Sequence, residues 1–230
     1  AVAIAFAREG ADVALNYLPS EEDDAQQVCD LIRSAGQRAI PLPGDLSDPA
    51  FCRHLVDHAV AELGQLDILV NNAGRQIAVE SFEDLTDEQW TTTFETNIHA
   101  IYRVTQAAVP HLPPGSSIIN NTSIQAYDPS PVLLDYAATK GAINNFTKGL
   151  GQQLAPRGIR VNAVAPGPIW TVLQVSDGQP KDKLPVFGHD TPLGRAGQPT
   201  EIAPAFVFLA SSESSYVIGE TLNVNGGRPT

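Results

Sequence analysis

The segment Asp67-Ile68-Leu69-Val70-Asn71 is a short run of mainly apolar residues, and Asn72-Ala73-Gly74 follows it directly. Such a run, bounded by turn-forming residues, is typical of a buried strand that ends in a tight turn. Five comparable runs lie elsewhere in the chain, at residues 12–17, 38–42, 117–122, 160–165 and 221–224. Segments with helical periodicity separate them. This alternation predicts an α/β fold with a doubly wound, mostly parallel sheet.

The helices are predicted from periodicity and from their end signals. Thr86 and Gln89 form a capping box at the start of a long helix that extends to about residue 109. Other helices are expected at residues 20–36, 48–63, 132–154 and 201–210, and before Gly10. Residues 168–199 contain several Pro and Gly and show no sustained period. We expect them to form a loop with some short helix, which acts as a lid over a substrate.

Composition narrows the class of protein. The 230 residues include 14 basic and 26 acidic side chains, which gives a net charge of −12. This length fits a single domain, and this charge disfavours nucleic acid as a partner. No apolar run is long enough to span a bilayer, and the first residues do not resemble a secretion signal, so a cytoplasmic location is expected. The two cysteines and five histidines form no metal-ligand cluster, so no metal is expected.

The residues Tyr136-Ala137-Ala138-Thr139-Lys140 place a phenol and an ammonium group four positions apart on one helix face. A nearby cation favours the phenolate and so lowers the pKa of a tyrosine toward the range of a general acid/base. Ser123 lies thirteen residues earlier, just after a predicted strand. Because open parallel sheets bind ligands at the carboxyl ends of their strands, its hydroxyl is expected beside Tyr136, where it would hold a substrate oxygen.

The order and spacing of these segments resemble the short-chain dehydrogenase/reductase family over nearly the whole chain. The matching segments are NNAG at 71–74, Asn97 in TNIHA, Ser123 in NTS, YAATK at 136–140, RVNAVAPG at 160–167 and GETLNVNGG at 219–227. The resemblance implies a Rossmann-like fold in one dinucleotide-binding domain over residues 1–230. It also implies an NAD(P)-dependent oxidoreductase that interconverts a carbonyl and an alcohol.

The family comparison implies a role for each catalytic residue. Tyr136 would be the general acid/base, and Ser123 would polarise the substrate oxygen. Lys140 would lower the pKa of Tyr136 and hold the nicotinamide ribose. Asn97 would hold a water molecule that connects Lys140 to solvent.

The family comparison also implies the residues that bind the cofactor and the substrate. The implied cofactor-binding residues are Asn16, Asp45, Leu46, Asn71, Ala73, Gly74, Tyr136, Lys140, Pro166, Gly167, Ile169 and Thr171. Contact with the substrate is expected from Ser123, Gln125, Tyr136 and Trp170. Tyr127 and Ile124, which lie near Ser123 in the sequence, are further candidates for contact with the substrate.

One departure from the family pattern concerns the start of the chain. The family's glycine-rich phosphate loop, between its first strand and first helix, has no match in the sequence. We therefore expect the chain to be N-terminally incomplete and to lack the family's first strand. Since that strand would lie between residues 12–17 and 67–71, these two strands are expected to have unpaired edges.

The cofactor preference depends on the end of the strand at 12–17. Asn16, Tyr17 and Leu18 include no carboxylate that would accept a hydrogen bond from the 2′-hydroxyl of NAD. This end would not repel a 2′-phosphate, although residues 18–20 include no Arg or Lys to bind one. The sequence therefore favours NADP over NAD.

Two alternatives and the assembly state remain as hypotheses. A sugar-nucleotide epimerase or dehydratase shares the Tyr/Lys pair, but only about ninety residues follow Tyr136, too few for a substantial sugar domain. The other alternative is a cofactor-free pseudoenzyme or partner subunit of the same fold. Family membership implies a homo-oligomer, a tetramer or dimer, which packs through the helices at 86–109 and 132–154, with a small-molecule carbonyl or alcohol as substrate.

Overall fold

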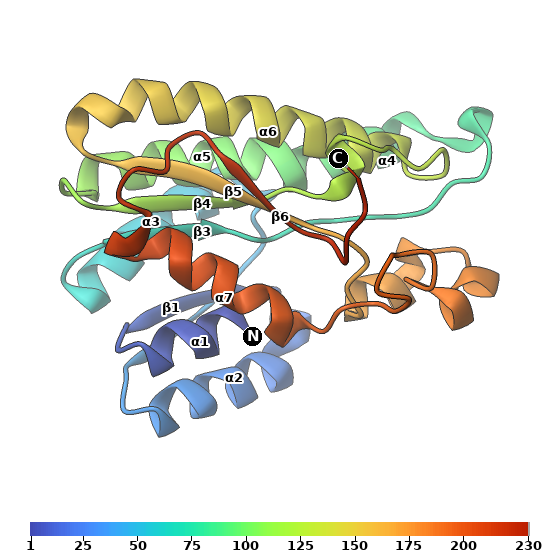
Figure 1. Ribbon diagram of the computed structural model, residues 1–230. Coiled ribbons are helices and arrows are strands. Elements are labelled where there is room, and N and C mark those ends of the chain that lie inside the picture. Colours follow the sequence, from blue (N-terminus) through green and yellow to red (C-terminus); the bar gives the residue numbers. More distant parts are fainter. Residues whose placement is uncertain (230) are drawn as a thin grey trace.

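The computed structural model describes residues 1–229 and contains all six predicted strands (Figure 1). Their bounds are β1 Val13–Tyr17, β2 Ala39–Pro43, β3 Ile68–Asn71, β4 Ser117–Asn121, β5 Arg160–Pro166 and β6 Thr221–Val224. The α-helices are α1 Val2–Arg8, α2 Glu22–Ser34, α3 Pro49–Leu63, α4 Asp87–Phe94, α5 Ala100–Ala108, α6 Leu134–Leu154 and α7 Pro199–Ala210. The alternation of strand and helix that the sequence predicts is confirmed.

All strand pairs are parallel, and the strands form two separate sheets. One sheet has the order β1-β2, and the other has the order β3-β4-β5-β6. Within the described residues β1 pairs only with β2, and β3 pairs only with β4. Among residues 1–229, one edge of β1 and one edge of β3 are therefore unpaired, as predicted for residues 12–17 and 67–71.

Helices cover both faces of the strands (Figure 1). On one face α1 contacts both α2 and α7, and on the other face α3 packs on α5 while α6 packs on β5. Neighbouring residues of β4 point in opposite directions: Ile119 packs in a cluster with Phe206 of α7, and Ile118 packs with Leu154 of α6. This is the doubly wound, Rossmann-like arrangement, with hydrophobic packing on each face of the sheet.

The long helix predicted at 86–109 is present over residues 87–108, with a π-helical turn in its middle. Its first turn begins as predicted, because the Thr86 side chain accepts a hydrogen bond from the Gln89 N–H at 3.1 Å. The α-helix then gives way to a π-helical turn at Glu95–His99 before α5 begins. Asn97 is fully buried in this turn, where its side chain binds the backbone of Arg75. Single π turns occur often at functional sites.

The segment at 168–199 stands beside the carboxyl ends of β3, β4 and β5 (orange in Figure 1). It contains a π-helical turn at Gln174–Gly178 and a 3-10 helix at Lys181–Val186. Its first residues pair with its last, since a backbone bridge joins Ile169 to Gly197. The expected loop with short helix is confirmed.

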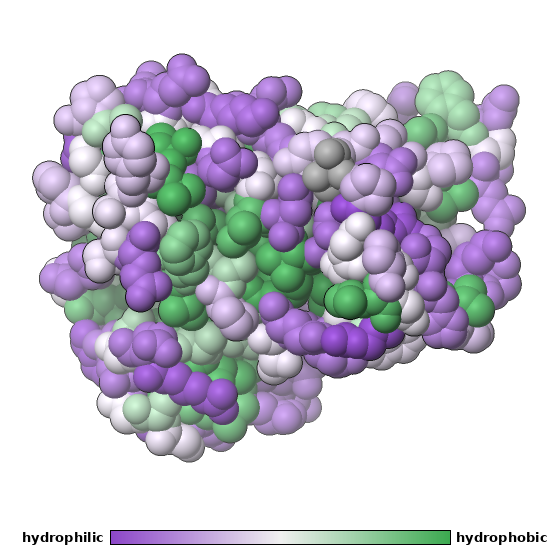
Figure 2. Space-filling model, viewed as in Figure 1, coloured by the Kyte–Doolittle hydropathy of each residue, from purple (hydrophilic) through white to green (hydrophobic). Residues whose placement is uncertain are grey.

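The surface in Figure 2 separates by hydropathy. Hydrophobic residues lie in the middle of this face, on and beside α7, and hydrophilic residues occupy much of the periphery. None of the helices within residues 1–229 is long and apolar enough to cross a membrane.

Candidate active site

Helix α6 presents Tyr136 and Lys140 one turn apart. Tyr136 is 8% exposed and Lys140 is 2% exposed. The Lys140 Nζ lies 5.2 Å from the centre of the Tyr136 ring. The predicted phenol and ammonium pair is therefore formed, in a part of the protein from which water is largely excluded.

Ser123 completes this arrangement from the end of β4. The Ser123 side chain is hydrogen-bonded to the Tyr136 hydroxyl. Its Oγ also accepts a hydrogen bond from the Gln125 N–H at 3.2 Å, which fixes the direction of the hydroxyl. Ser123 and Tyr136, thirteen residues apart in the sequence, thus place two hydroxyl groups together at the carboxyl edge of the sheet.

Lys140 connects α6 to the ends of β3 and β4. Its Nζ donates a hydrogen bond to the backbone carbonyl of Asn121 at 2.7 Å, and the Asn121 amide donates to Asn72 Oδ1 at 3.0 Å. A side chain added at Gly74 would place its Cβ 3.8 Å from Lys140 Nζ, so the NNAG turn lies directly beside the ammonium group. The Asn121 Oδ1 atom is buried and has no hydrogen-bond partner among the described residues.

Asn97 lies close to Lys140, but its side chain binds neither the Lys140 nor the Tyr136 side chain. Its Oδ1 accepts from the Arg75 N–H at 2.7 Å, and its Nδ2 donates to the Arg75 carbonyl at 2.9 Å and to Thr139 Oγ1 at 3.1 Å. Asn97 therefore holds the turn after β3 against α6. Its predicted water-binding role stays a prediction.

Burial controls the pKa values of the pair. Burial raises the pKa of Tyr136 to about 12, and the hydrogen bond from Ser123 opposes this only in part. Burial likewise lowers the pKa of Lys140 to about 7. The Tyr/Lys spacing predicts that Lys140 lowers the pKa of Tyr136. The structure differs, because burial disfavours the phenolate and the opposing contribution comes from Ser123 rather than from Lys140. In this state Tyr136 is a neutral phenol at physiological pH.

The lowered pKa of Lys140 makes stability depend on pH. Between pH 7 and the ordinary lysine pKa of 10.5, the folded protein binds fewer protons than the unfolded chain, so its stability rises with pH. From pH 7 to 9 we expect the free energy of unfolding to rise by about 2 kcal/mol more in the wild type than in Lys140→Met. Urea unfolding at both pH values measures this difference. Equal pH dependence in the two proteins would show that Lys140 titrates normally.

The predicted adenosine-binding residues form two groups. Asn71 is buried, and its amide donates to Thr105 Oγ1 at 3.0 Å and to Asn120 Oδ1 at 2.8 Å, so its side chain joins β3 to β4. Ala73 and Gly74 are exposed at the same edge, where their backbone is open to a ligand. The structure thus brings the backbone of this turn, rather than the Asn71 side chain, to the expected site.

The other group comes from the two-stranded sheet. The Asn16 amide donates to the carbonyls of Leu42 and Gly44, at 2.9 and 3.1 Å, and so joins β1 to the end of β2. Asp45 is exposed, and its carboxylate accepts from the Ser47 N–H at 2.8 Å. Leu46 packs partly into the hydrophobic core beside α3. These residues lie at the carboxyl ends of β1 and β2, on the ligand edge that the sequence predicts.

The expected nicotinamide-binding segment continues from β5. Its predicted residues Pro166, Gly167, Ile169 and Thr171 are all half-buried. A Cβ at Gly167 would lie only 2.6 Å from the Asn225 Cα, so glycine allows the loops after β5 and β6 to meet. Trp170 is 42% exposed, and its ring centre lies 6.1 Å from that of Phe187 within the segment 168–199.

The predicted substrate contacts from the loop after Ser123 have other partners. Gln125 Oε1 accepts from the Ser130 N–H at 2.6 Å and so stabilises its own loop. Tyr127 is 40% exposed, whereas Ile124 is 4% exposed and belongs to the core. Their contact with a substrate stays a prediction.

Three further buried residues lie near the site and are not evident from the sequence alone. Gln76 donates from its side chain to the carbonyl of Gly178 and so holds the segment 168–199 to the turn after β3. Asp135 and Thr139 bind the backbone of Tyr136 from its two sides. Asp135 directly precedes the YAATK motif, and Thr139 lies within it. Their other hydrogen-bond partners come from distant segments, and no local sequence pattern reveals such partners.

The chain is similar to known oxidoreductases along nearly its whole length. A family model described as enoyl-(acyl carrier protein) reductase matches residues 1–228. The chain is 58% identical over 233 residues to an oxidoreductase of Bacillus subtilis (strain 168), which covers 100% of this chain and 78% of the relative. It is also 44% identical over 233 residues to an NADPH-dependent aldehyde reductase of Arabidopsis thaliana, which covers 99% and 81%.

A solved structure is similar over nearly the same length. It is a short chain dehydrogenase from Burkholderia cenocepacia J2315 in complex with NADP, with a TM-score of 0.89 and 36% sequence identity. The match covers 98% of this chain and 91% of the other.

Proposed function

The chain belongs to the short-chain dehydrogenase/reductase family, and from this premise we propose that it is an NADPH-dependent enzyme that reduces a carbonyl group to an alcohol. The single observation that carries the proposal is the meeting of Ser123, Tyr136 and Lys140 beside the NNAG turn. The bound nicotinamide would supply the hydride, and the protein would supply position and the proton.

The pKa of Tyr136 supports the direction of the proposed reaction. A phenol whose pKa is about 12 holds its proton at neutral pH, so it is prepared to donate that proton to a carbonyl oxygen as negative charge develops there. Ser123 donates a hydrogen bond to the same oxygen. The substrate class is therefore a small aldehyde or ketone, and the printed name of the Arabidopsis relative, an aldehyde reductase, supports it.

Lys140 and its neighbours fit the ribose of a dinucleotide. An ammonium group has three N–H donors, and the bond to the Asn121 carbonyl uses one of them. The buried, unpartnered Asn121 Oδ1 is an acceptor for a ribose hydroxyl. The absence of a carboxylate at Asn16 favours the 2′-phosphate of NADP, and NADP or NADPH appears in the names of the Burkholderia and Arabidopsis proteins.

The remaining parts of the proposal concern organisation. We assign residues 1–230 to a single dinucleotide-binding domain and residues 168–199 to a substrate lid that Gln76 holds to the site. A homodimer or homotetramer fits the exposed aromatic residues of α4 and α5, since Trp90 is 41% and Tyr102 is 51% exposed. A cytoplasmic location remains part of the proposal.

The cofactor proposal is tested by titrating the full-length protein with NADPH and NADH and following cofactor fluorescence. We expect the dissociation constant for NADPH to be at least about tenfold lower than that for NADH, which corresponds to a difference of about 1.4 kcal/mol in binding free energy. Turnover is then measured with glyceraldehyde, benzaldehyde and cyclohexanone. Crotonyl-CoA serves as the enoyl control, because the matching family model is named after enoyl reductases.

Each outcome of this titration has a distinct meaning. NADPH binding with turnover of an aldehyde or ketone supports the proposal. Tighter binding of NADH contradicts the proposed cofactor. Turnover of crotonyl-CoA alone contradicts the proposed reduction of a C=O bond, because it would show that the enzyme reduces a C=C bond. Failure to bind either cofactor would favour a cofactor-free pseudoenzyme or partner subunit.

A further inference from the structure

We propose that residues 87–99, from α4 through the π turn, position Tyr136 for proton transfer by holding both ends of its peptide through Asp135 and Thr139. The inference rests on the proposed function, because it assigns Tyr136 the proton. It makes Asp135 and Thr139 positioning residues rather than catalytic ones.

The N–H of Tyr136 is held by Asp135. Tyr136 lies in the first turn of α6, where the backbone N–H groups have no helical acceptor. The Asp135 Oδ1 accepts this N–H at 2.8 Å. The other carboxylate oxygen accepts from Thr93 Oγ1 at 2.7 Å and from Gln89 Nε2 at 3.2 Å, and both donors belong to α4.

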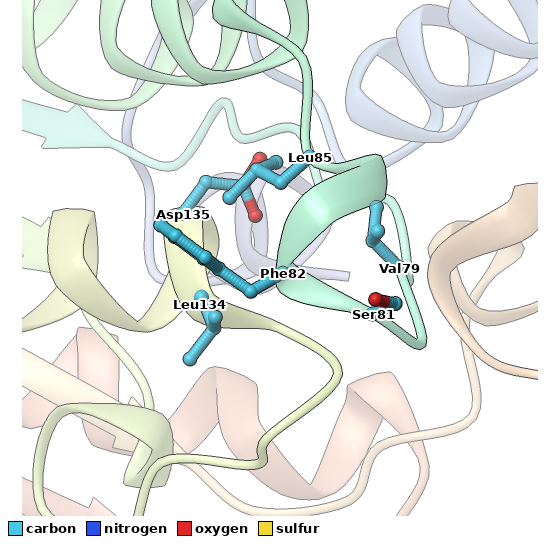
Figure 3. Close-up of a pocket in the computed structure, with 6 residues that line it drawn as sticks. All are labelled: Val79, Ser81, Phe82, Leu85, Leu134 and Asp135. Carbon is cyan, nitrogen blue, oxygen red and sulfur yellow. The ribbon is translucent and has the colours of Figure 1, made fainter.

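Asp135 is a buried carboxylate with neutral partners only. It is 1% exposed, and no ion pair involving it occurs within residues 1–229. Figure 3 shows it among the residues that line a small pocket, together with the apolar side chains of Phe82, Leu85 and Leu134. Burial of a charge is costly unless its hydrogen bonds are made, so the three donors must stay in place. This requirement makes the link between α4 and Tyr136 stiff.

The carbonyl of Tyr136 is held by Thr139. The Thr139 Oγ1 donates to this carbonyl at 2.7 Å and accepts from Asn97 Nδ2 at 3.1 Å. Thr139 and Asn97 are both fully buried. Asn97 belongs to the π turn that continues α4, so the same segment reaches Tyr136 a second time.

The two contacts fix Tyr136 more tightly than helical hydrogen bonding would alone. The first turn of a helix is its loosest part, because half of its backbone bonds are missing. A displacement of about 1 Å at a reacting group costs about a hundredfold in rate. The double contact therefore holds the Tyr136 hydroxyl against Ser123.

The test compares kcat with the dissociation constant for NADPH in Asp135→Ala, Asp135→Asn and Thr139→Val. We expect kcat for the best aldehyde of the panel to fall about 10- to 100-fold in Asp135→Ala and about tenfold in Thr139→Val. The dissociation constant for NADPH should change less than about twofold. Asp135→Asn should recover kcat to within about threefold of wild type, because its oxygen still accepts the Tyr136 N–H. Its amide can donate to Thr93 Oγ1 and, once the Gln89 amide turns over, to the Gln89 side-chain oxygen.

The matched control is Thr147→Val, which lies two turns beyond Thr139 on α6. Thr147 is equally buried, accepts from Asn120 Nδ2 at 2.9 Å and donates to the Ile143 carbonyl at 2.8 Å. Its loss should lower the melting temperature without lowering kcat. If Thr139→Val and Asp135→Ala match this control in kcat, the positioning role is wrong.

A crystal structure of each variant gives a result that does not depend on turnover. We expect the hydrogen bond between Ser123 and the Tyr136 hydroxyl to be lost or lengthened in Asp135→Ala and Thr139→Val, and to be kept in Thr147→Val. If this hydrogen bond persists in Asp135→Ala and Thr139→Val, the inference is overturned even when the wild-type enzyme is active. An inactive wild type with the expected displacement would instead contradict the proposed function alone.

Discussion

Replacing Tyr136 by phenylalanine is expected to lower kcat for carbonyl reduction by about 10³-fold or more, while NADPH still binds. The change removes one oxygen from a side chain that is 8% exposed and leaves the ring in place. General acid catalysis by a positioned side chain contributes about 10²- to 10⁴-fold, and Ser123 loses its hydrogen-bond partner in addition. Steady-state kinetics and cofactor fluorescence on the same preparation measure the two effects.

Tyr216→Phe is the matched control for this prediction. Tyr216 lies on the surface before β6, where its side chain is fully exposed and outside the buried group around Lys140. Its kcat should stay within about twofold of wild type. A Tyr136→Phe enzyme with kcat close to this control would contradict the proposed mechanism, since a group other than Tyr136 would then donate the proton.

The strands were predictable from sequence because each carries its own signal. The runs at 67–71 and 117–122 each contain adjacent apolar residues, at 68–70 and 118–119, and are followed by Asn72 and Ser123. Both their location and their ligand edge therefore follow from the local pattern. The spacing of Tyr136 and Lys140 is likewise local. The structure confirms that these two residues and Ser123 meet.

The features that were missed depend on contacts between distant segments. The π turn at Glu95–His99 follows from the fit of Asn97 to the backbone of Arg75, twenty-two residues away. The raised pKa of Tyr136 follows from its burial, which is set by the whole fold rather than by the cation four residues later. Spacing along a helix predicts which groups meet, whereas the energy of their interaction depends on how much water remains between them.

The largest effect on stability is expected from Arg160, a residue to which the sequence analysis gave no separate role. Arg160 lies at the start of β5, is 7% exposed, and has no carboxylate partner within the described part of the chain. Its Nη1 donates to the Leu209 carbonyl at 2.7 Å and to Ser214 Oγ at 2.5 Å. Its Nη2 donates to the carbonyls of Ala210 and Ser211, at 3.2 and 3.1 Å. These carbonyls end α7, where the helix dipole favours a cation.

We expect Arg160→Met to lower the free energy of unfolding by about 3 kcal/mol, because it leaves several buried carbonyls without a donor. For a chain of this length that corresponds to a fall in melting temperature of about 10 °C. Urea unfolding and calorimetry measure both values. Arg157→Met is the control, since Arg157 donates a single exposed hydrogen bond to Val109, and it should change stability by about 0.5 kcal/mol or less.

The same variant separates stability from catalysis. β5 runs from Arg160 at one edge of the sheet to Pro166 at the edge that carries the site, a distance of about 20 Å for its seven residues. Below its melting temperature, Arg160→Met should therefore keep the wild-type dissociation constant for NADPH. Equal losses of stability in Arg160→Met and Arg157→Met would show that solvent replaces the guanidinium at the end of α7. A loss of NADPH affinity well below the melting temperature would show instead that the end of α7 is coupled to the ligand edge through β5.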